Sequence, residues 1–231
     1  MPTPTKSSTE PRVPLSKERV LHAAVALADE GGIDSLTMRK LARSLGVEAM
    51  SLYYHVDNKD DILDGMVDVV FGEIVLPPHG DGWKTAMRER AISTRTVLSR
   101  HPWATSMMQS RPNPGPALLR HHDWVIGTLR ESGFSVELTA HAFSAMDAYI
   151  YGFSLQEETL PFDTPEEVAV IVEAFLEHFP VDEYPYLAEL SAEHIMKPGY
   201  DYSDEFGFGL DLVLDGLERA QSQSASISPQ A

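Results

Sequence analysis

The side chains whose types and spacing suggest chemistry lie between residues 37 and 59. Arg39 can read guanine N7 and O6 from a major groove, and Lys59 adds positive charge near the start of a following helix. Four uncharged hydrogen-bonding groups that can reach phosphates stand between them: Ser51, Tyr53, Tyr54 and His55. Ala49 and Met50 offer only apolar contact, for example with thymine methyl groups. The set indicates binding to double-stranded DNA, although Tyr53 and Tyr54 could instead pack a small helical core.

Other groupings of reactive side chains do not support an enzyme, a metal site or a cofactor. Adjacent residues on a helix point in different directions, so the His-His-Asp run at 121–123 does not share a face. The glycines at 207 and 209 lack the third glycine of a dinucleotide loop and follow no predicted strand. The acid pairs at 157–158 and 166–167 are typical of solvated charges. We therefore expect no catalytic residue, no metal and no cofactor.

The charge is distributed unevenly along the chain. The net charge of −17 disfavours a nucleic-acid partner when taken as a whole. Residues 1–59, however, carry eight Lys or Arg against seven Asp or Glu, whereas residues 60–231 carry ten against 28. This asymmetry is typical of a protein of which only one end approaches DNA, and it also suits an acidic surface that confers solubility.

Composition also bears on location. The chain has no cysteine, which fits a reducing compartment, and no apolar run approaches the roughly 20 residues needed to cross a bilayer. The opening residues lack the apolar segment of a secretion signal. We expect a cytoplasmic protein that does not contact membranes.

The elements that must position the candidate DNA contacts are short helices with recognisable ends. Ser16 is a candidate N-cap for a first helix, which Gly31-Gly32 ends. Thr37 can cap a second helix, which Gly46 breaks, and a third is predicted from about Glu48 to His55. Two short helices joined across one glycine predict a helix-turn-helix over Thr37–His55.

The remaining pattern is helical too, so we predict an all-α protein in which an N-terminal three-helix helix-turn-helix domain precedes a larger helical domain. Asn58 can cap a connecting helix over 58–75. Apolar residues recur at helical spacing over 83–99, 115–131, 135–153 and 203–218. Residues 101–116 are rich in helix breakers and are predicted to be a linker. The tails 1–14 and 221–231 are predicted to be disordered.

The stretch LTMRKLARSLGVEAMSLYYHVDNKDDIL, residues 36–63, resembles the DNA-binding domain of the tetracycline-repressor family. The resemblance implies a domain over 15–62, with the helix at 58–75 as connector. It also implies that Thr37 begins a helix pressed on the DNA backbone and that five residues contact operator bases or phosphates: Arg39, Ser51, Tyr53, His55 and Lys59. Ala49 and Met50 stand where the tetracycline repressor has a polar base-reading residue and a proline, so the operator is expected to differ.

Residues 76–220 resemble, more weakly, the ligand-binding and dimerisation domain of the same family. The resemblance implies that the helices at 135–153 and 203–218 of two subunits form a four-helix bundle, although their apolar stripes could equally be core within one chain. It implies a homodimeric transcriptional repressor that binds a pseudo-palindromic operator and is released by a small-molecule inducer. The alternatives are a helical small-molecule-binding or interaction protein whose helix-turn-helix does not read DNA, and a ligand-independent regulator or activator.

The candidate ligand pocket combines apolar side chains with a few polar groups, although each position could equally be plain core. Its members are Trp103, Met107, Gln109, Arg111, Trp124, Phe143, Met146, Tyr149 and Gln156. By resemblance, Met107 and Gln156 stand where the tetracycline repressor uses a histidine and a glutamate around drug-bound magnesium. A thioether and an amide are poor substitutes at a hard-cation site, so we expect the inducer to be something other than magnesium-tetracycline.

Overall fold

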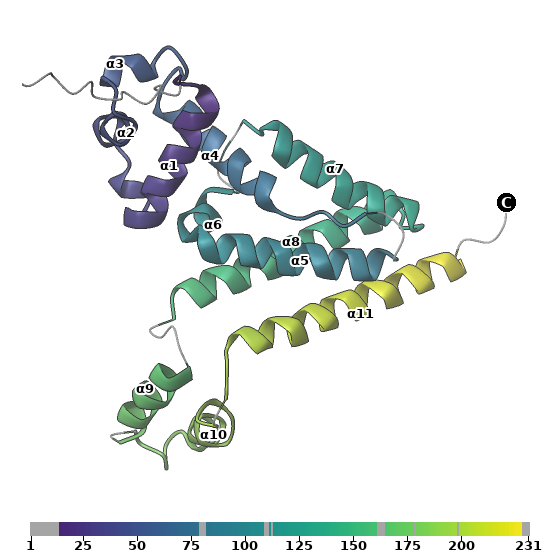
Figure 1. The fold of residues 1–231 in the computed structure, drawn as a ribbon. Helices are drawn as coiled ribbons and strands as arrows, with labels where there is room; N and C mark the ends of the chain where they lie inside the picture. The colour runs from purple at the N-terminus through teal and green to yellow at the C-terminus, as the bar shows by residue number, and fades with distance from the viewer. Residues whose placement is uncertain are drawn as a thin grey trace, which may run out of the picture.

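In the computed structural model the chain is described over residues 14–78, 82–108, 111, 113–160, 165–177, 179–197 and 199–227. These residues form eleven α-helices with short helical turns and no strand, which confirms the all-α prediction. None of the helices is long and apolar enough to cross a membrane. Figure 1 shows α1 to α3 at one end, α4 leading from them into the larger helical body, and α11 running along that body.

The N-terminal unit comprises α1 (Lys17–Gly31), α2 (Met38–Leu45) and α3 (Ala49–Leu52), with a 3-10 turn at Ile33–Ser35. The predicted ends of α1 and α2 are confirmed. The Ser16 side chain accepts a hydrogen bond from the N–H of Arg19, and the Thr37 hydroxyl accepts one from the N–H of Lys40. Gly46 ends α2 with a φ of 66°, a left-handed conformation that glycine adopts without strain.

Two predicted boundaries are wrong by a few residues. The α3 helix ends at Leu52, and 53–55 form turns instead of extending the helix to His55. Asn58 caps the connecting helix α4 (Lys59–Glu73) as predicted, but α4 ends two residues before Val75 because Ile74 adopts an extended backbone. Neither difference moves the N-terminal core, in which Leu41, Leu52 and Val56 are buried.

The larger body contains α5 (Trp83–Arg100), α6 (Pro102–Met108), α7 (Pro116–Glu131), α8 (Val136–Glu158) and α11 (Ser203–Ile227). The prediction of a linker over 101–116 is wrong for its first half, because α6 occupies it. Proline is tolerated in the first turn of a helix, where its missing N–H is not needed, so Pro102 starts this helix instead of breaking it. The α11 helix continues through Ile227, so 221–227 are helical and not part of a disordered tail.

Two further helices were not identified from the sequence. They are α9 (Pro165–Glu177) and α10 (Pro185–Leu190), the second followed by a π-helical turn at Ser191–Ile195. Figure 1 shows α9 and α10 as a lobe set apart from the main body, beside the start of α11. The lobe exposes large apolar side chains, including Val170, Tyr186 and Leu190.

Candidate nucleic-acid interface and ligand cavity

The surface formed by α2, α3 and the turn after α3 carries the candidate DNA contacts. Tyr53 and Tyr54 are 47% and 88% exposed, so they do not pack the three-helix core. Met50 is 73% exposed, while Ala49, Ser51 and His55 are half-buried beside it. Leu52 and Val56, on the opposite side, are buried and hold the turn against α2. Because Leu52 and Val56 are buried, the polar and aromatic side chains on the other side of the helix and turn face the solvent.

The same surface holds uncompensated positive charge. Arg39, Lys40, Arg43 and Lys59 are exposed, and none makes an ion pair within the described part of the chain. A cation that is not neutralised by a neighbouring carboxylate can displace counterions from a phosphate backbone. Thr37 is exposed at the N-terminus of α2, where its hydroxyl is already used as the helix cap.

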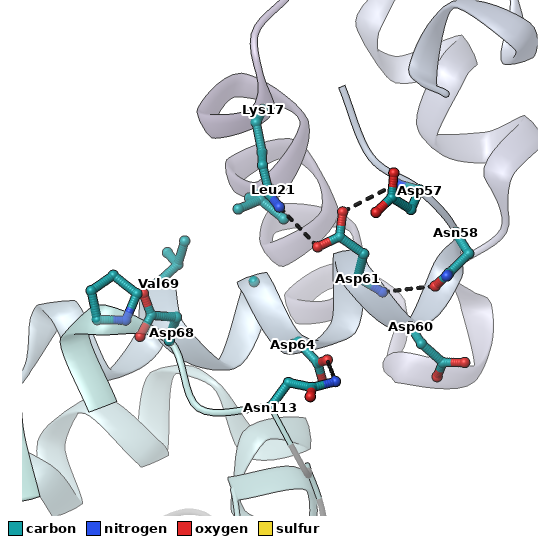
Figure 2. Close-up of a pocket in the computed structure, with 13 residues that line it drawn as sticks. Lys17, Leu21, Asp57, Asn58, Asp60, Asp61, Asp64, Asp68, Val69 and Asn113 are labelled. Atoms are coloured by element: carbon teal, nitrogen blue, oxygen red, sulfur yellow. Dashed lines mark hydrogen bonds and ion pairs between the residues drawn. The ribbon is translucent and has the colours of Figure 1, made fainter. Parts of the chain in front are cut away.

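The connector α4 carries a stripe of aspartates that faces the body. Asp60, Asp64 and Asp68 recur every four residues and therefore lie on one side of the helix. Together with Asp57 and Asp61, they line a cavity of ≈ 600 Å³ between α1, α4 and the start of α7 (Figure 2).

Each aspartate of this stripe has a partner in the 111–118 segment. Asp64 accepts hydrogen bonds from Arg111 Nε at 2.5 Å and from Asn113 Nδ2 at 3.0 Å, and Figure 2 shows the Asn113 side chain directed at Asp64. Burial alone would raise the pKa of Asp64, but the bonds from Asn113 and Arg111 outweigh it and leave the pKa below its usual value.

Asp60 and Asp68 extend this link at its two ends. Asp60 Oδ1 accepts from Arg111 Nη2 at 3.1 Å, and Asp68 Oδ1 accepts from the N–H groups of Ala117 and Leu118 at 2.8 and 3.0 Å. Asp68 thereby satisfies free donors at the N-terminus of α7. A Cβ on Gly115 would collide with the Asp68 carboxylate, so this close approach requires glycine. These bonds connect α4 to Arg111, to Asn113 and to the start of α7.

A second polar link joins α1 directly to the body. The Asp29 carboxylate accepts from Trp103 Nε1 at 2.7 Å and contacts His101 Nδ1 at 2.8 Å, while His101 Nε2 lies 3.3 Å from Glu73. Trp103, one of the candidate pocket residues, is used in this link between α1 and α6 and does not line the cavity described next.

A second cavity, of ≈ 630 Å³, lies between α4, the α6–α7 segment and α8. Among the candidate pocket residues, the structure places Arg111 and Phe143 on its wall. The apolar part of the lining also includes Phe71, Met108, Leu118 and Leu119. Arg111 contacts both this cavity and α4, so one side chain joins the candidate ligand space to the connector.

Apart from Arg111, the polar residues of the lining were not identified from the sequence. Asp147 faces the cavity, and its Oδ1 accepts from Arg90 Nη2 at 2.7 Å. Arg90 is fully buried and also donates from Nε to His121 Nε2 at 3.1 Å. Burial, aided by Arg90, lowers the pKa of His121 to about 2, so this ring is neutral and carries its proton on Nδ1. A lone aspartate within the largely apolar run of α8 was the available signal.

The other candidate pocket residues do not come together with Phe143. Met146 is in the core, and Met107 and Trp124 pack against it. Tyr149 donates to the carbonyl of Phe206 at 2.9 Å, and Gln156 accepts from the Tyr202 hydroxyl at 3.2 Å, so both join α8 to the start of α11. Gln109 lies outside the described residues.

The glycine at 209 has a packing role. A Cβ there would collide with the Tyr149 ring, which stacks on Phe206 with ring centroids 5.5 Å apart.

The described residues contain no group of three or more His, Cys, Asp or Glu that could hold a metal ion.

The α11 helix has two apolar faces with different roles. The stripe singled out in the sequence packs within the chain, with Phe206, Leu210, Leu214 and Leu217 all buried against the body. A second face carries Phe208 and Leu212, which are 68% and 58% exposed. The adjacent α8 also exposes small residues at one-turn spacing: Ala140, Ser144, Ala148 and Gly152. Each helix therefore has an exposed face of apolar or small residues, and Ser144 and Ala148 on α8 also line the second cavity.

Comparison with known proteins is consistent with this geometry. Residues 20–66 match the profile described as bacterial regulatory proteins, tetR family, and residues 76–221 match that of the tetracyclin repressor-like C-terminal domain. The HTH-type transcriptional repressor DrrR1 of Streptomyces coeruleorubidus is 33% identical over 94% of this chain and 82% of its own. The tetracycline repressor class G of Vibrio anguillarum is 30% identical over 90% and 96%.

A solved structure extends the comparison to the fold. The TetR family protein ActR of Streptomyces coelicolor, in complex with actinorhodin, superposes with a TM-score of 0.74 at 26% identity, covering 90% of this chain and 99% of its own.

Proposed function

The chain belongs to the tetracycline-repressor family of bacterial regulatory proteins, and on this premise we propose that it is a homodimeric transcriptional repressor that leaves its DNA operator when a small molecule binds. The observation that carries the proposal is the position of Arg111. This side chain lines the cavity between α4 and α8 and also pairs with Asp60 and Asp64 on the helix that leads to the DNA-binding unit.

The proposed DNA contacts lie on the exposed surface of α2, α3 and the following turn. Arg39 reads a base edge, Lys59 contacts a phosphate, and Thr37 places the N-terminus of α2 against the backbone. The remaining proposed contacts are Ala49, Met50, Ser51, Tyr53, Tyr54 and His55. One such surface covers too few base pairs for genomic specificity, so two copies related by a two-fold axis read half-sites about 34–36 Å apart, or a multiple of that distance.

Release follows from linkage between the two sites. The proposal involves two states of the dimer, one in which the two DNA-binding units have the spacing of the operator half-sites and one in which α4 is displaced and the spacing is wrong. A ligand that binds the second state more tightly lowers operator affinity, at most by the ratio of its affinities for the two states. The bound ActR structure, which contains actinorhodin, supports a small organic molecule as the kind of ligand.

Fluorescence anisotropy with purified protein tests the proposal. The probes are palindromic sequences found upstream of the gene itself or of its neighbours, each compared with a scrambled duplex of the same length and composition. We expect binding at least about 10³-fold tighter to one palindrome at physiological salt. A small-molecule extract of the cells that naturally contain this protein should then release the labelled DNA and lower the anisotropy. Equal affinity for the palindrome and its scrambled control would instead support a helical binding protein that does not read DNA.

Replacing Asp64 with asparagine tests the link between α4 and the 111–118 segment. The Asp64 side chain is 13% exposed and takes charge-assisted bonds, so Asp64→Asn should lower the free energy of unfolding by about 1.5–3 kcal/mol in urea titrations at pH 7. The matched control is Asp60→Asn, four residues earlier on the same stripe. Its side chain is 77% exposed, so we expect a loss of less than about 1 kcal/mol.

The pH dependence of the Asp64 effect has a defined sign. Because the folded-state pKa of Asp64 is depressed, its contribution is present above the unfolded pKa near 3.8 and is lost as the pH falls through the folded value. The difference between the wild type and Asp64→Asn should therefore narrow below about pH 4. A difference that is equal to that of Asp60→Asn, or that grows in acid, would show that the link does not hold α4.

A further inference from the structure

We propose that the cavity between α4, the α6–α7 segment and α8 takes an uncharged aromatic compound that presents a hydroxyl donor to the carboxylate of Asp147. The inference rests on the proposed function, because it names the chemical class of ligand for the same cavity.

The walls favour a flat ring system. Phe71 and Phe143 each form a T-shaped pair with His122, with centroid distances of 6.0 and 5.1 Å and interplanar angles of 84° and 90°. Met108 and Leu118 complete the apolar surface. Aromatic rings that pack edge-to-face stabilise each other by more than the burial of their apolar area, so these side chains favour a ligand ring. The thioether of a methionine also contacts aromatic rings favourably. With ≈ 630 Å³, the cavity is within the size range of drug-sized ligands.

Asp147 supplies the directional group. Its side chain is 12% exposed, and only Oδ1 takes a hydrogen bond within the described residues, from Arg90. An ionised carboxylate accepts and does not donate, so its second oxygen can be satisfied only by a donor on the ligand or by water. A ligand hydroxyl can donate to this oxygen, whereas a ligand in which the hydroxyl hydrogen is replaced cannot, and it loses a hydrogen bond to a charged acceptor.

The charged groups around the cavity are paired or neutral, so the cavity should not strongly prefer an ionised ligand. Fully buried Arg90 neutralises Asp147, and burial keeps His122 uncharged by lowering its pKa. Burial raises the pKa of Tyr151, so its hydroxyl stays protonated at neutral pH. The charge of Arg111 is compensated by Asp60 and Asp64.

This balance bears on both signs of ligand charge. A ligand carboxylate beside Asp147 would be repelled by a like charge. A ligand cation would lose its hydration and gain little attraction in return, because Arg90 already neutralises Asp147. An uncharged donor meets neither penalty. Tyr151, on the same wall, can bond a second ligand oxygen.

Three tricyclic probes that differ in one substituent test the inference: 9-phenanthrol, 9-methoxyphenanthrene and phenanthrene-9-carboxylate. Their binding to the wild-type protein without DNA is measured by tryptophan fluorescence. We expect the phenol to bind at least tenfold more tightly than the ether and the carboxylate, since loss of one hydrogen bond to a charged acceptor costs about 1.4 kcal/mol or more. Equal binding of phenol and ether, tightest binding of the carboxylate, or binding by none of the three would overturn it.

Two variants locate the preference. Asp147→Asn should reduce the phenol-to-ether ratio at least threefold, with thermal unfolding followed by circular dichroism to show that the protein is folded. The control, Glu137→Gln, removes the same charge from the exposed first turn of α8 and should leave the ratio unchanged. If Asp147→Asn does not fold, the three probes on the wild type still decide.

The outcomes separate this inference from the function on which it rests. A phenol preference in a protein that ignores every palindrome would contradict the repressor and leave the ligand class standing. Specific operator binding that cell extract relieves, without a phenol preference, would contradict the ligand class alone.

Discussion

Replacing Phe208 with glutamate is expected to weaken specific operator binding by at least about 100-fold while leaving each subunit folded. Phe208 is 68% exposed and contributes little to the core of its own chain, which instead uses Phe206 and Leu210 on the neighbouring face of α11. In the proposed dimer the same side chain is covered by the second copy. Placing a carboxylate there buries an unpaired charge on each side of a two-fold interface.

The size of the effect follows from bivalency. When two half-sites are read by linked subunits, the second contact is intramolecular, and linkage strengthens binding by 10²–10⁴-fold. Loss of the dimer should therefore weaken operator binding by at least about 100-fold. Anisotropy measures the affinity, and sedimentation equilibrium measures the subunit mass in the same buffer.

The matched control is Val75→Glu, which adds the same charge to an apolar side chain that is 66% exposed and belongs to the connection between α4 and α5 instead of to α11. It should bind the operator like the wild type. If Phe208→Glu remains a dimer, or if it becomes a monomer that binds as well as before, the exposed face of α11 is not the interface that DNA reading requires.

Arg39→Ala and Lys59→Ala should weaken operator binding in two different ways. Both side chains are exposed and make no ion pair within the described residues, so truncation should not alter folding. Loss of a base contact by Arg39 should cost about 1–3 kcal/mol per site and relax the preference at one position of each half-site.

Loss of a phosphate contact by Lys59 should weaken all sequences alike and reduce the slope of log K against log salt by about one unit per copy.

Anisotropy with the operator, with single-base variants of it and with a scrambled duplex, over a series of salt concentrations, distinguishes the two roles. Arg120→Ala is the control, because Arg120 is an exposed cation on α7, in the larger body. Normal binding by both Arg39→Ala and Lys59→Ala would show that DNA does not lie on this surface. A uniform loss for Arg39→Ala would reassign that residue to the backbone.

The helical elements that carry the DNA contacts could be predicted because their determinants are local. Ser16, Thr37 and Asn58 each bond an N–H three residues ahead, and Gly46 ends α2 through its own backbone conformation. Prediction failed where a local signal was ambiguous. Pro102 in a breaker-rich segment marks the start of α6, and the turn after Leu52 replaces a further helical turn. Periodicity also identified the buried stripe of α11 but could not say which chain covers it.

The sequence by itself thus determined the helix-turn-helix scaffold and the residue types on its surface, since those depend on interactions within about four residues. Only the tertiary structure decided that Arg90, His121 and Asp147 form one buried group, because His121 and Asp147 lie 31 and 57 residues from Arg90 along the chain. It also decided that Arg111 pairs with Asp64 across 47 residues while lining the cavity. Such pairs are set by helix packing, which brings together side chains whose separation along the chain carries no periodic signal.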